Sequence, residues 1–234
     1  MGIAPTRPRI ALIQDQRRTA IMTDDLLENL EKQSAWDRFY RRNTARPFKH
    51  FDWFLGYSTL HGILGQLLEA VDSEGPRRLL DLGCGTSELG PRLYCQCPFP
   101  LHVDCVDFSP VALALMRAQF SSLPPPGNPA SRLRFLLADA THLADFQQGT
   151  FDLVLDKGTM DALLRANDGG LAATRALAAS LRVLRAGGFI LQVSDEDPDT
   201  RILWLQRLRT VSVTVLELDT DSRMGYFAYI IKPA

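Results

Sequence analysis

Two glycines that follow a short apolar run create the most chemically suggestive stretch of the chain. The run, residues 79–82, contains Asp81 and leads into Gly83 and Gly85. Glycine has no Cβ, so it accepts positive φ angles and lets a ligand approach the backbone. Residues 87–94 then have the composition of a helix, with Thr86 or Ser87 as its N-cap. A strand, a glycine loop and a helix in this order predict a nucleotide-type binding corner.

Acidic residues close the strands that we expect next. Asp107 ends a predicted strand, Asp139 follows another, and Asp156 ends a third. Asp107 lies 24 residues after Gly83, the spacing at which a strand-end carboxylate meets ribose hydroxyls. Ligands of open α/β sheets bind at the carboxyl ends of the strands. We therefore expect these acids to face one site.

The glycine spacing separates two kinds of cofactor. A dinucleotide fingerprint requires G-x-G-x-x-G, but the third glycine here is Gly90, two positions late. S-adenosylmethionine carries no phosphate, so it does not need that turn. In this interpretation the glycine loop holds the amino-acid end of the cofactor, Asp107 binds the ribose, and Asp139 binds the adenine amino group. The pattern favours S-adenosylmethionine.

The amino-acid composition and charge argue against several classes of protein. The 234 residues are 46% hydrophobic and 23% charged, with a net charge of −1. Such a balance gives no field that would draw the protein to nucleic acid or to a membrane surface. No apolar run approaches the ~20 residues of a membrane-spanning helix. The four cysteines cluster in residues 84–105, which argues for a reducing compartment. A zinc set of Cys95, Cys97, His102 and Cys105 is disfavoured because Cys105 lies within a predicted strand, so we expect no metal.

The order of the predicted elements indicates an α/β fold. Five strands alternate with helices, and an antiparallel hairpin, residues 211–218 and 226–231, follows them. This predicts a Rossmann-like, seven-stranded sheet that is mostly parallel, with helices on both faces. Residues 23–234 form one domain with a helical and aromatic extension at 23–75. Residues 1–22 are rich in arginine and poor in acids, so they are either a mitochondrial presequence or a flexible tail.

Several motifs resemble one enzyme family. Residues 80–86 are similar to the first motif of the seven-stranded, class I S-adenosylmethionine-dependent methyltransferases, and Asp107 and Asp139 match their strand-end acids. Residues 156–162, D-K-G-T-M-D-A, resemble the signature of protein-lysine methyltransferases that act on elongation factor 1A and on citrate synthase. Residues 51–57 and 194–199 resemble the mitochondrial citrate synthase-lysine methyltransferases.

The resemblance implies methyl transfer from S-adenosylmethionine to a lysine side chain of citrate synthase, in the mitochondrial matrix, by a monomer. Two alternatives stay open at this point. One is a small-molecule methyltransferase, because the scaffold fixes the cofactor more than the acceptor. The other is a non-catalytic, cofactor-binding assembly factor.

Roles follow for the remaining candidate residues. Asp156 is expected to orient the target ammonium and to take its proton, or else to cap the next helix. Trp53 and Tyr57 are expected to close over the methionine moiety, because aromatic faces attract cations, or else to pack in the core. The acids after the fifth strand are expected to receive a basic protein surface, or else to form a solvated turn; they are Asp195, Glu196 and Asp197. The predicted cofactor contacts are Asp81, Gly83, Gly85, Asp107, Phe108, Asp139, Ala140, Trp53 and Tyr57.

Overall fold

The computed structural model describes residues 24–42, 49–207, 211–220 and 225–234, and within these ranges one sheet organises the protein. Its strands lie in the order β3-β2-β1-β4-β5-β7-β6. Their bounds are β1 Arg77–Leu82, β2 Leu101–Asp107, β3 Arg132–Leu137, β4 Phe151–Lys157, β5 Leu184–Ser194, β6 Val211–Leu218 and β7 Tyr226–Pro233. Strands β1 to β5 pair in parallel, and β7 runs antiparallel between β5 and β6. The predicted fold class is confirmed. The expected presequence or tail, residues 1–22, lies outside the described residues.

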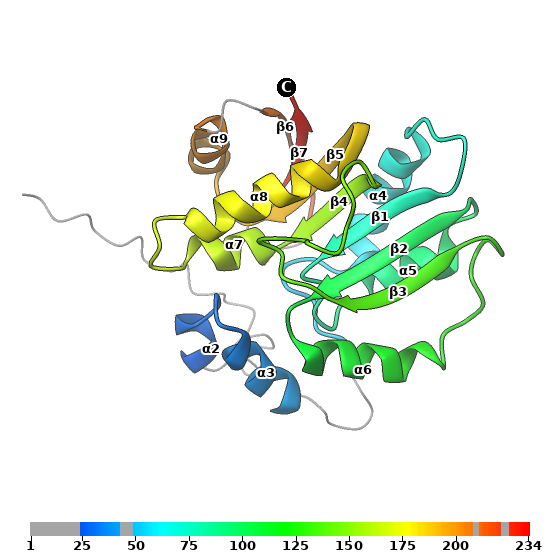
Figure 1. Ribbon diagram of the computed structural model, residues 1–234, viewed down its shortest axis with the longest axis horizontal. Coiled ribbons are helices and arrows are strands. Elements are labelled where there is room, and N and C mark those ends of the chain that lie inside the picture. Colours follow the sequence, from blue (N-terminus) through cyan, green and yellow to red (C-terminus); the bar gives the residue numbers. More distant parts are fainter. Residues whose placement is uncertain (1–23, 43–48, 208–210, 221–224) are drawn as a thin grey trace, which may run out of the picture.

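Helices cover both faces of the sheet (Figure 1). Their bounds are α2 Asp24–Glu28, α3 Gln33–Arg42, α4 Tyr57–Glu69, α5 Leu89–Gln96, α6 Pro110–Phe120, α7 Thr159–Leu164, α8 Leu171–Val183 and α9 Pro198–Gln206. One apolar core joins α4, α5 and α6 to side chains such as Leu79 and Leu191. A second core joins α8 and α9 to the opposite face through Leu80 and Ile190. Alternate residues of one strand thus enter different cores, as the period of two requires.

The first residues of α6 and α5 show how local sequence shapes the loops that follow β2 and β1. Helix α6 follows β2 at once, because the Ser109 hydroxyl accepts the Ala112 N–H at 3.2 Å and proline stands at the first helical position. The predicted N-cap at Thr86 or Ser87 is wrong. Helix α5 begins later, at Leu89, and Glu88 is its N-cap. The longer loop leaves the backbone after β1 available to a ligand.

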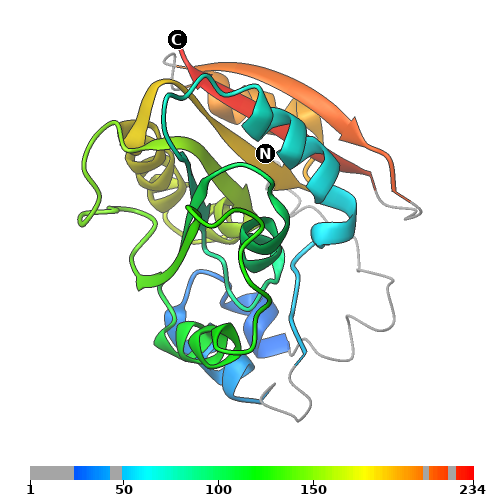
Figure 2. The same ribbon diagram turned by 90° about the vertical axis from the view of Figure 1, so that its right-hand side faces the viewer.

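Helices α2 and α3 lie across the carboxyl ends of the strands. A third apolar cluster, which contains Leu26, Leu30 and Phe39, joins them to Ala112 of α6 and Ala162 of α7. Figure 2 shows this pair beside α6, at the end of the molecule opposite the hairpin β6–β7. The N-terminal extension therefore roofs the edge where ligands of such sheets bind.

Two further searches concern only the described residues. None of their helices has both the length and the apolar character needed to cross a bilayer. No group of three or more histidine, cysteine or acidic side chains among them is arranged to hold a metal ion.

Candidate functional site

A pocket lies between the strand ends and the N-terminal roof. Its floor comes from the loop after β1 and from the ends of β2 and β4, and its roof comes from the extension. The lining residues are Leu30, Glu31, Trp36, Tyr40, Phe51, Trp53, Gly83, Cys84, Gly85, Val106, Asp107, Phe108, Ala138, Asp139, Ala140, Lys157, Gly158, Thr159, Ala162 and Leu163. Seven of the predicted cofactor contacts are among them: Gly83, Gly85, Asp107, Phe108, Asp139, Ala140 and Trp53.

The glycine loop is tight in both conformation and space. Gly83 has φ +65° and Gly85 has φ +53°. A Cβ at Gly83 would lie 1.9 Å from the Thr159 hydroxyl oxygen, and one at Gly85 would lie 2.6 Å from the Tyr40 hydroxyl oxygen. The Thr159 hydroxyl also donates to the Leu82 carbonyl at 2.9 Å, which ties the loop to α7. Only glycine fits at both positions, so the cradle that the spacing predicts is present.

Asp107 joins the end of β2 to this loop. One carboxylate oxygen accepts the Gly85 N–H at 2.8 Å and the other accepts the Ser109 N–H at 2.7 Å. Burial raises the pKa of Asp107 to about 6, although these hydrogen bonds oppose the shift. Each oxygen of a carboxylate can accept a second hydrogen bond. The side chain is therefore suited to receive two neighbouring hydroxyls, as a ribose offers.

Asp139 lines the same pocket from the segment after β3. Its carboxylate accepts the Thr141 N–H at 2.8 Å and contacts His142 Nδ1 at 3.2 Å. Burial alone would raise the pKa of Asp139, but the bonds from Thr141 and His142 outweigh it and lower the pKa. The carboxylate stays ionised and fixed in direction, which suits an acceptor for an adenine amino group. Phe108 and Ala140 add apolar surface beside it.

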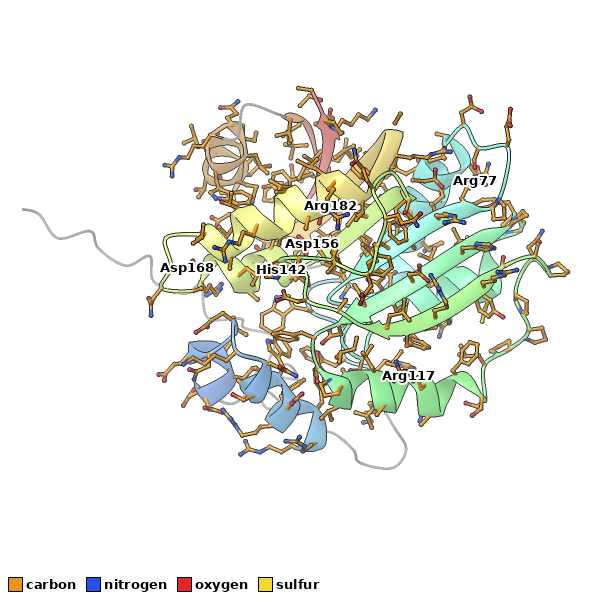
Figure 3. All side chains as sticks on the ribbon, viewed as in Figure 1. Arg77, Arg117, His142, Asp156, Asp168 and Arg182 are labelled. Carbon is orange, nitrogen blue, oxygen red and sulfur yellow. The ribbon has the colours of Figure 1, made fainter. Side chains whose placement is uncertain are left out.

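Asp156 lies beside the pocket but is buried. The side chain, labelled in Figure 3, has no exposed surface and is not among the residues that line the pocket. One oxygen accepts the N–H groups of Thr159 and Met160 at 2.9 and 3.2 Å, and the other accepts the Gln192 amide at 2.7 Å. Burial raises its pKa to about 6. Asp156 therefore holds the first turn of α7, one of the two roles expected for it, and its contact with the amine stays a prediction.

A buried lysine fastens the roof to the floor. Lys157, at the end of β4, donates to the Trp53 carbonyl at 2.9 Å and pairs with Asp52 at 3.1 Å. The Ser87 hydroxyl donates to the same Asp52 carboxylate. Sequence reasoning missed Lys157 as a site residue. The only sequence signal for Lys157 is its place between Asp156 and Gly158 at the end of a strand. A lysine there needs a partner, because burying an unpaired charge is costly.

The roof itself is aromatic. The rings of Trp36 and Trp53 lie 5.6 Å apart, and Trp36 stacks on Tyr40 at 5.7 Å. Gly158 has φ +92°, and a Cβ there would lie 2.5 Å from Trp53 Cδ1, so Trp53 rests directly on the backbone after β4. Helical spacing places Trp36 and Tyr40 on one face of α3, but spacing alone does not show which partner that aromatic face covers.

Two predicted cofactor contacts lie outside the pocket. The Tyr57 hydroxyl donates to Gln96 Oε1 at 3.0 Å and its ring stacks on His61, which places it on the surface of α4. Asp81 lies buried beneath the loop, where its carboxylate accepts the Cys105 thiol at 3.8 Å. Burial raises the pKa of Asp81 to about 7. Both side chains have other partners in this structure, and their contact with the cofactor stays a prediction.

The acidic turn after β5 adjoins the site without lining it. Asp197 caps α9 by accepting the Asp199 N–H at 2.8 Å, and Glu196 is exposed. Asp195 is half-buried, and burial raises its pKa. Because β5 is next to β4 in the sheet, this turn lies at the same edge as the pocket. Its position and its acidic side chains permit contact with a second protein.

Comparison with known proteins places this site in a family. A model described as a methyltransferase domain matches residues 79–188. The mitochondrial citrate synthase-lysine N-methyltransferase of Danio rerio is 40% identical over 99% of this chain and 95% of its own. The protein of the same name from Homo sapiens is 43% identical over 87% of each chain.

Solved structures agree on the fold. A SAM-dependent methyltransferase from Leishmania major has a TM-score of 0.55 at 16% identity, with 93% of this chain and 90% of that chain covered. One from Aquifex aeolicus has a TM-score of 0.54 at 12% identity, over 73% and 88% of the chains. These two show the fold alone. By its sequence, over nearly its whole length, the chain belongs to the citrate synthase-lysine N-methyltransferase family.

Proposed function

We propose that the protein transfers a methyl group from S-adenosylmethionine to a lysine side chain of citrate synthase in the mitochondrial matrix. The observation that carries the chemistry is the cradle made by Gly83, Gly85 and the twice-bonded Asp107, which fits a nucleoside joined to an amino acid. The acceptor and the compartment are supported by the names of relatives at 40% and 43% identity.

The cofactor and the protein residues have separate roles in the proposed mechanism. The bound cofactor supplies an electrophilic methyl group on a sulfonium. The glycine loop lets the cofactor approach the backbone, Asp107 accepts its ribose hydroxyls, and Asp139 accepts its adenine amino group. Trp53 and Trp36 exclude water and present faces that attract a cation. These contacts fix the donor so that the acceptor nitrogen can approach in line.

The acceptor must lose a proton before it attacks. A free lysine amine with a pKa of 10.4 is only about 0.1% neutral near pH 7.4. Removal from water disfavours the charged form of an amine and lowers its pKa. The aromatic roof supplies that desolvation, so the ammonium gives its proton to solvent water as it enters the pocket, and we assign no proton transfer to Asp156. Asp156 acts as a positioning residue, because it holds the turn that carries Gly158 and Thr159.

The acidic turn is proposed to contact the protein substrate. Asp195, Glu196 and Asp197 lie at the pocket edge and would attract a basic, lysine-bearing surface. Replacing Glu196 by glutamine, which keeps the Asp197 cap of α9, is expected to raise KM for the protein and to leave cofactor affinity unchanged. An equal loss of cofactor affinity would place Glu196 in the structure of the pocket instead.

The central experiment follows methyl label from S-adenosylmethionine into purified citrate synthase and into a mitochondrial extract. We expect one labelled protein, and loss of label when the modified lysine of citrate synthase is changed to arginine. Undiminished labelling of that variant would rule out that lysine as the only target. Label confined to small molecules would support the small-molecule alternative. The Asp107→Ala protein is the control that should label citrate synthase at least about tenfold less at a cofactor concentration below its dissociation constant.

A further inference from the structure

A basic cluster lines a second cavity, at the other end of the sheet from the pocket. The cavity measures about 260 Å³ and is lined by Arg78, His102, Asp104, Arg132 and Arg134. Arg78, His102 and Arg132 are register partners on β1, β2 and β3, so they form one row across three adjacent strands. In Figure 1, α8 lies over β4 and β5, whereas no helix of the described chain lies in front of the amino-terminal parts of β2 and β3.

The charges of this cluster do not balance. The Arg134 guanidinium is engaged by Asp104 through two bonds of 2.6 Å. The side chains of Arg78 and Arg132 make no hydrogen bond or ion pair within the part of the chain that the structure describes. Three guanidinium groups thus face one carboxylate. Arg78 and Arg132 are both exposed and lie two strands apart, with His102 of β2 between them, so an anion in the hollow would meet two cations that the described residues leave unpaired.

His102 adds a further donor to the row. Its Nε2 donates to the Ala130 carbonyl at 3.2 Å, because a carbonyl oxygen can only accept. Nδ1 is therefore the nitrogen that is free to gain a proton. Burial lowers the pKa of His102, and Arg132 and Arg78 lower it further, although the bond to Ala130 opposes this. A nearby anion would reverse the effect of the arginines.

We propose that Arg78, His102 and Arg132 form a binding site for a compact, multivalent oxyanion, distinct from the cofactor pocket. Planar guanidinium groups bind phosphate and carboxylate oxygens in pairs of parallel hydrogen bonds. The site is a hollow between side chains of three strands, which suits a small ion better than an extended acidic surface. The Arg134–Asp104 pair closes one side of the hollow and is neutral as a pair, so Arg78 and Arg132 supply the net positive charge.

Calorimetry on the full chain tests the proposal. Inorganic phosphate and tricarballylate are titrated in separate arms against chloride at equal ionic strength, with the cofactor pocket saturated by S-adenosylhomocysteine. We expect binding in at least one arm, and the stronger arm identifies a phosphoryl or a polycarboxylate ligand. The double variant Arg78→Gln/Arg132→Gln should weaken it by at least about tenfold, because charge-assisted bonds are lost. Arg175→Gln, an exposed arginine of α8, is the matched control and should bind as the unaltered protein does.

A second readout needs no variant in the cluster. Proton NMR of the imidazole of His102 should show its pKa rise when the anion is added, while the chemical shifts of the exposed His61 ring at fixed pH stay unchanged. The proposal is overturned by equal binding in the double variant, by loss of binding on addition of S-adenosylhomocysteine, or by an unchanged pKa of His102. It is also overturned if neither anion binds at 20 mM, roughly the weakest affinity of physiological interest.

Discussion

Replacing Lys157 by methionine tests whether the roof is held by a buried ion pair. The Lys157 and Asp52 side chains are only 7% and 17% exposed, and their charged atoms lie 3.1 Å apart. Removing one partner of a buried pair leaves an uncompensated charge, which costs about 3–5 kcal/mol. Asp52 keeps its bond from Ser87 and some contact with water, so we expect the lower end of that range.

A double-mutant cycle isolates this interaction. The free energy of unfolding is measured in urea for Lys157→Met, Asp52→Asn and the double variant. We expect a coupling energy of about 2 kcal/mol, within the range for residues in direct contact. The matched control is the cycle for Arg38 and Asp25, a pair at 2.8 Å whose side chains are 44% and 47% exposed. Exposed pairs contribute less than about 1 kcal/mol.

Binding of S-adenosylhomocysteine supplies the functional half of the test. Lys157→Met should weaken it at least about tenfold, because Trp53 loses the bond to its carbonyl and the roof separates from the strand ends. Arg38→Met should leave it unchanged. Equal coupling in the two cycles, or full affinity in Lys157→Met, would refute the inference that this pair holds the roof in place.

Four further outcomes follow from the site. Asp107→Ala should lower cofactor affinity at least about tenfold in calorimetry, since two buried N–H groups also lose their acceptor; retained affinity would contradict the ribose assignment. Asp156→Asn should cost about 1 kcal/mol of unfolding free energy and lower kcat, with cofactor affinity largely kept; lost affinity would make it a cofactor contact. Trp53→Ala should weaken cofactor binding whereas Tyr57→Phe should not, and the reverse order would undo the placement of both rings. Burial raises the folded pKa of Asp81 to about 7, so its contribution to stability is full below about pH 4 and is lost as the pH rises through 7. Asp81→Asn should therefore raise the melting temperature at pH 8 and change it little at pH 4, and an equal shift at both would exclude the carboxylate as the cause.

The parts of the site that sequence reasoning found are those set by short-range spacing. The glycine loop, Asp107 and Asp139 follow directly from where parallel strands end, because the carboxyl ends of such strands share one edge. The antiparallel hairpin could also be predicted, since alternating apolar and polar residues and a turn between them mark it within some twenty positions. These predictions needed no knowledge of how distant segments pack.

The positions of the other site residues depend on how distant segments pack, which sequence patterns do not show. Asp107 and Asp156 both lie at strand ends, yet Asp107 lines the pocket and Asp156 faces the start of α7, because the residues after each strand turn differently. Tyr57 and Trp53 are four residues apart in one aromatic segment, but α4 begins between them and carries Tyr57 away. The role of Lys157 depends on Trp53 and Asp52, which lie about a hundred positions earlier in the sequence.

The separation between Lys157 and its partners affects how the protein folds during synthesis and how its helices open in the native state. The bond between Trp53 and Lys157 spans 104 positions, so the extension leaves the ribosome long before its anchor exists. The roof must dock after the strands that support it have paired, and closing so long a loop is slow. Segments that join last through few contacts are also the first to open in the native state. Hydrogen exchange should therefore find α2 and α3 opening at lower free energy than β1 and β4, so the roof can open while the sheet that it covers stays folded.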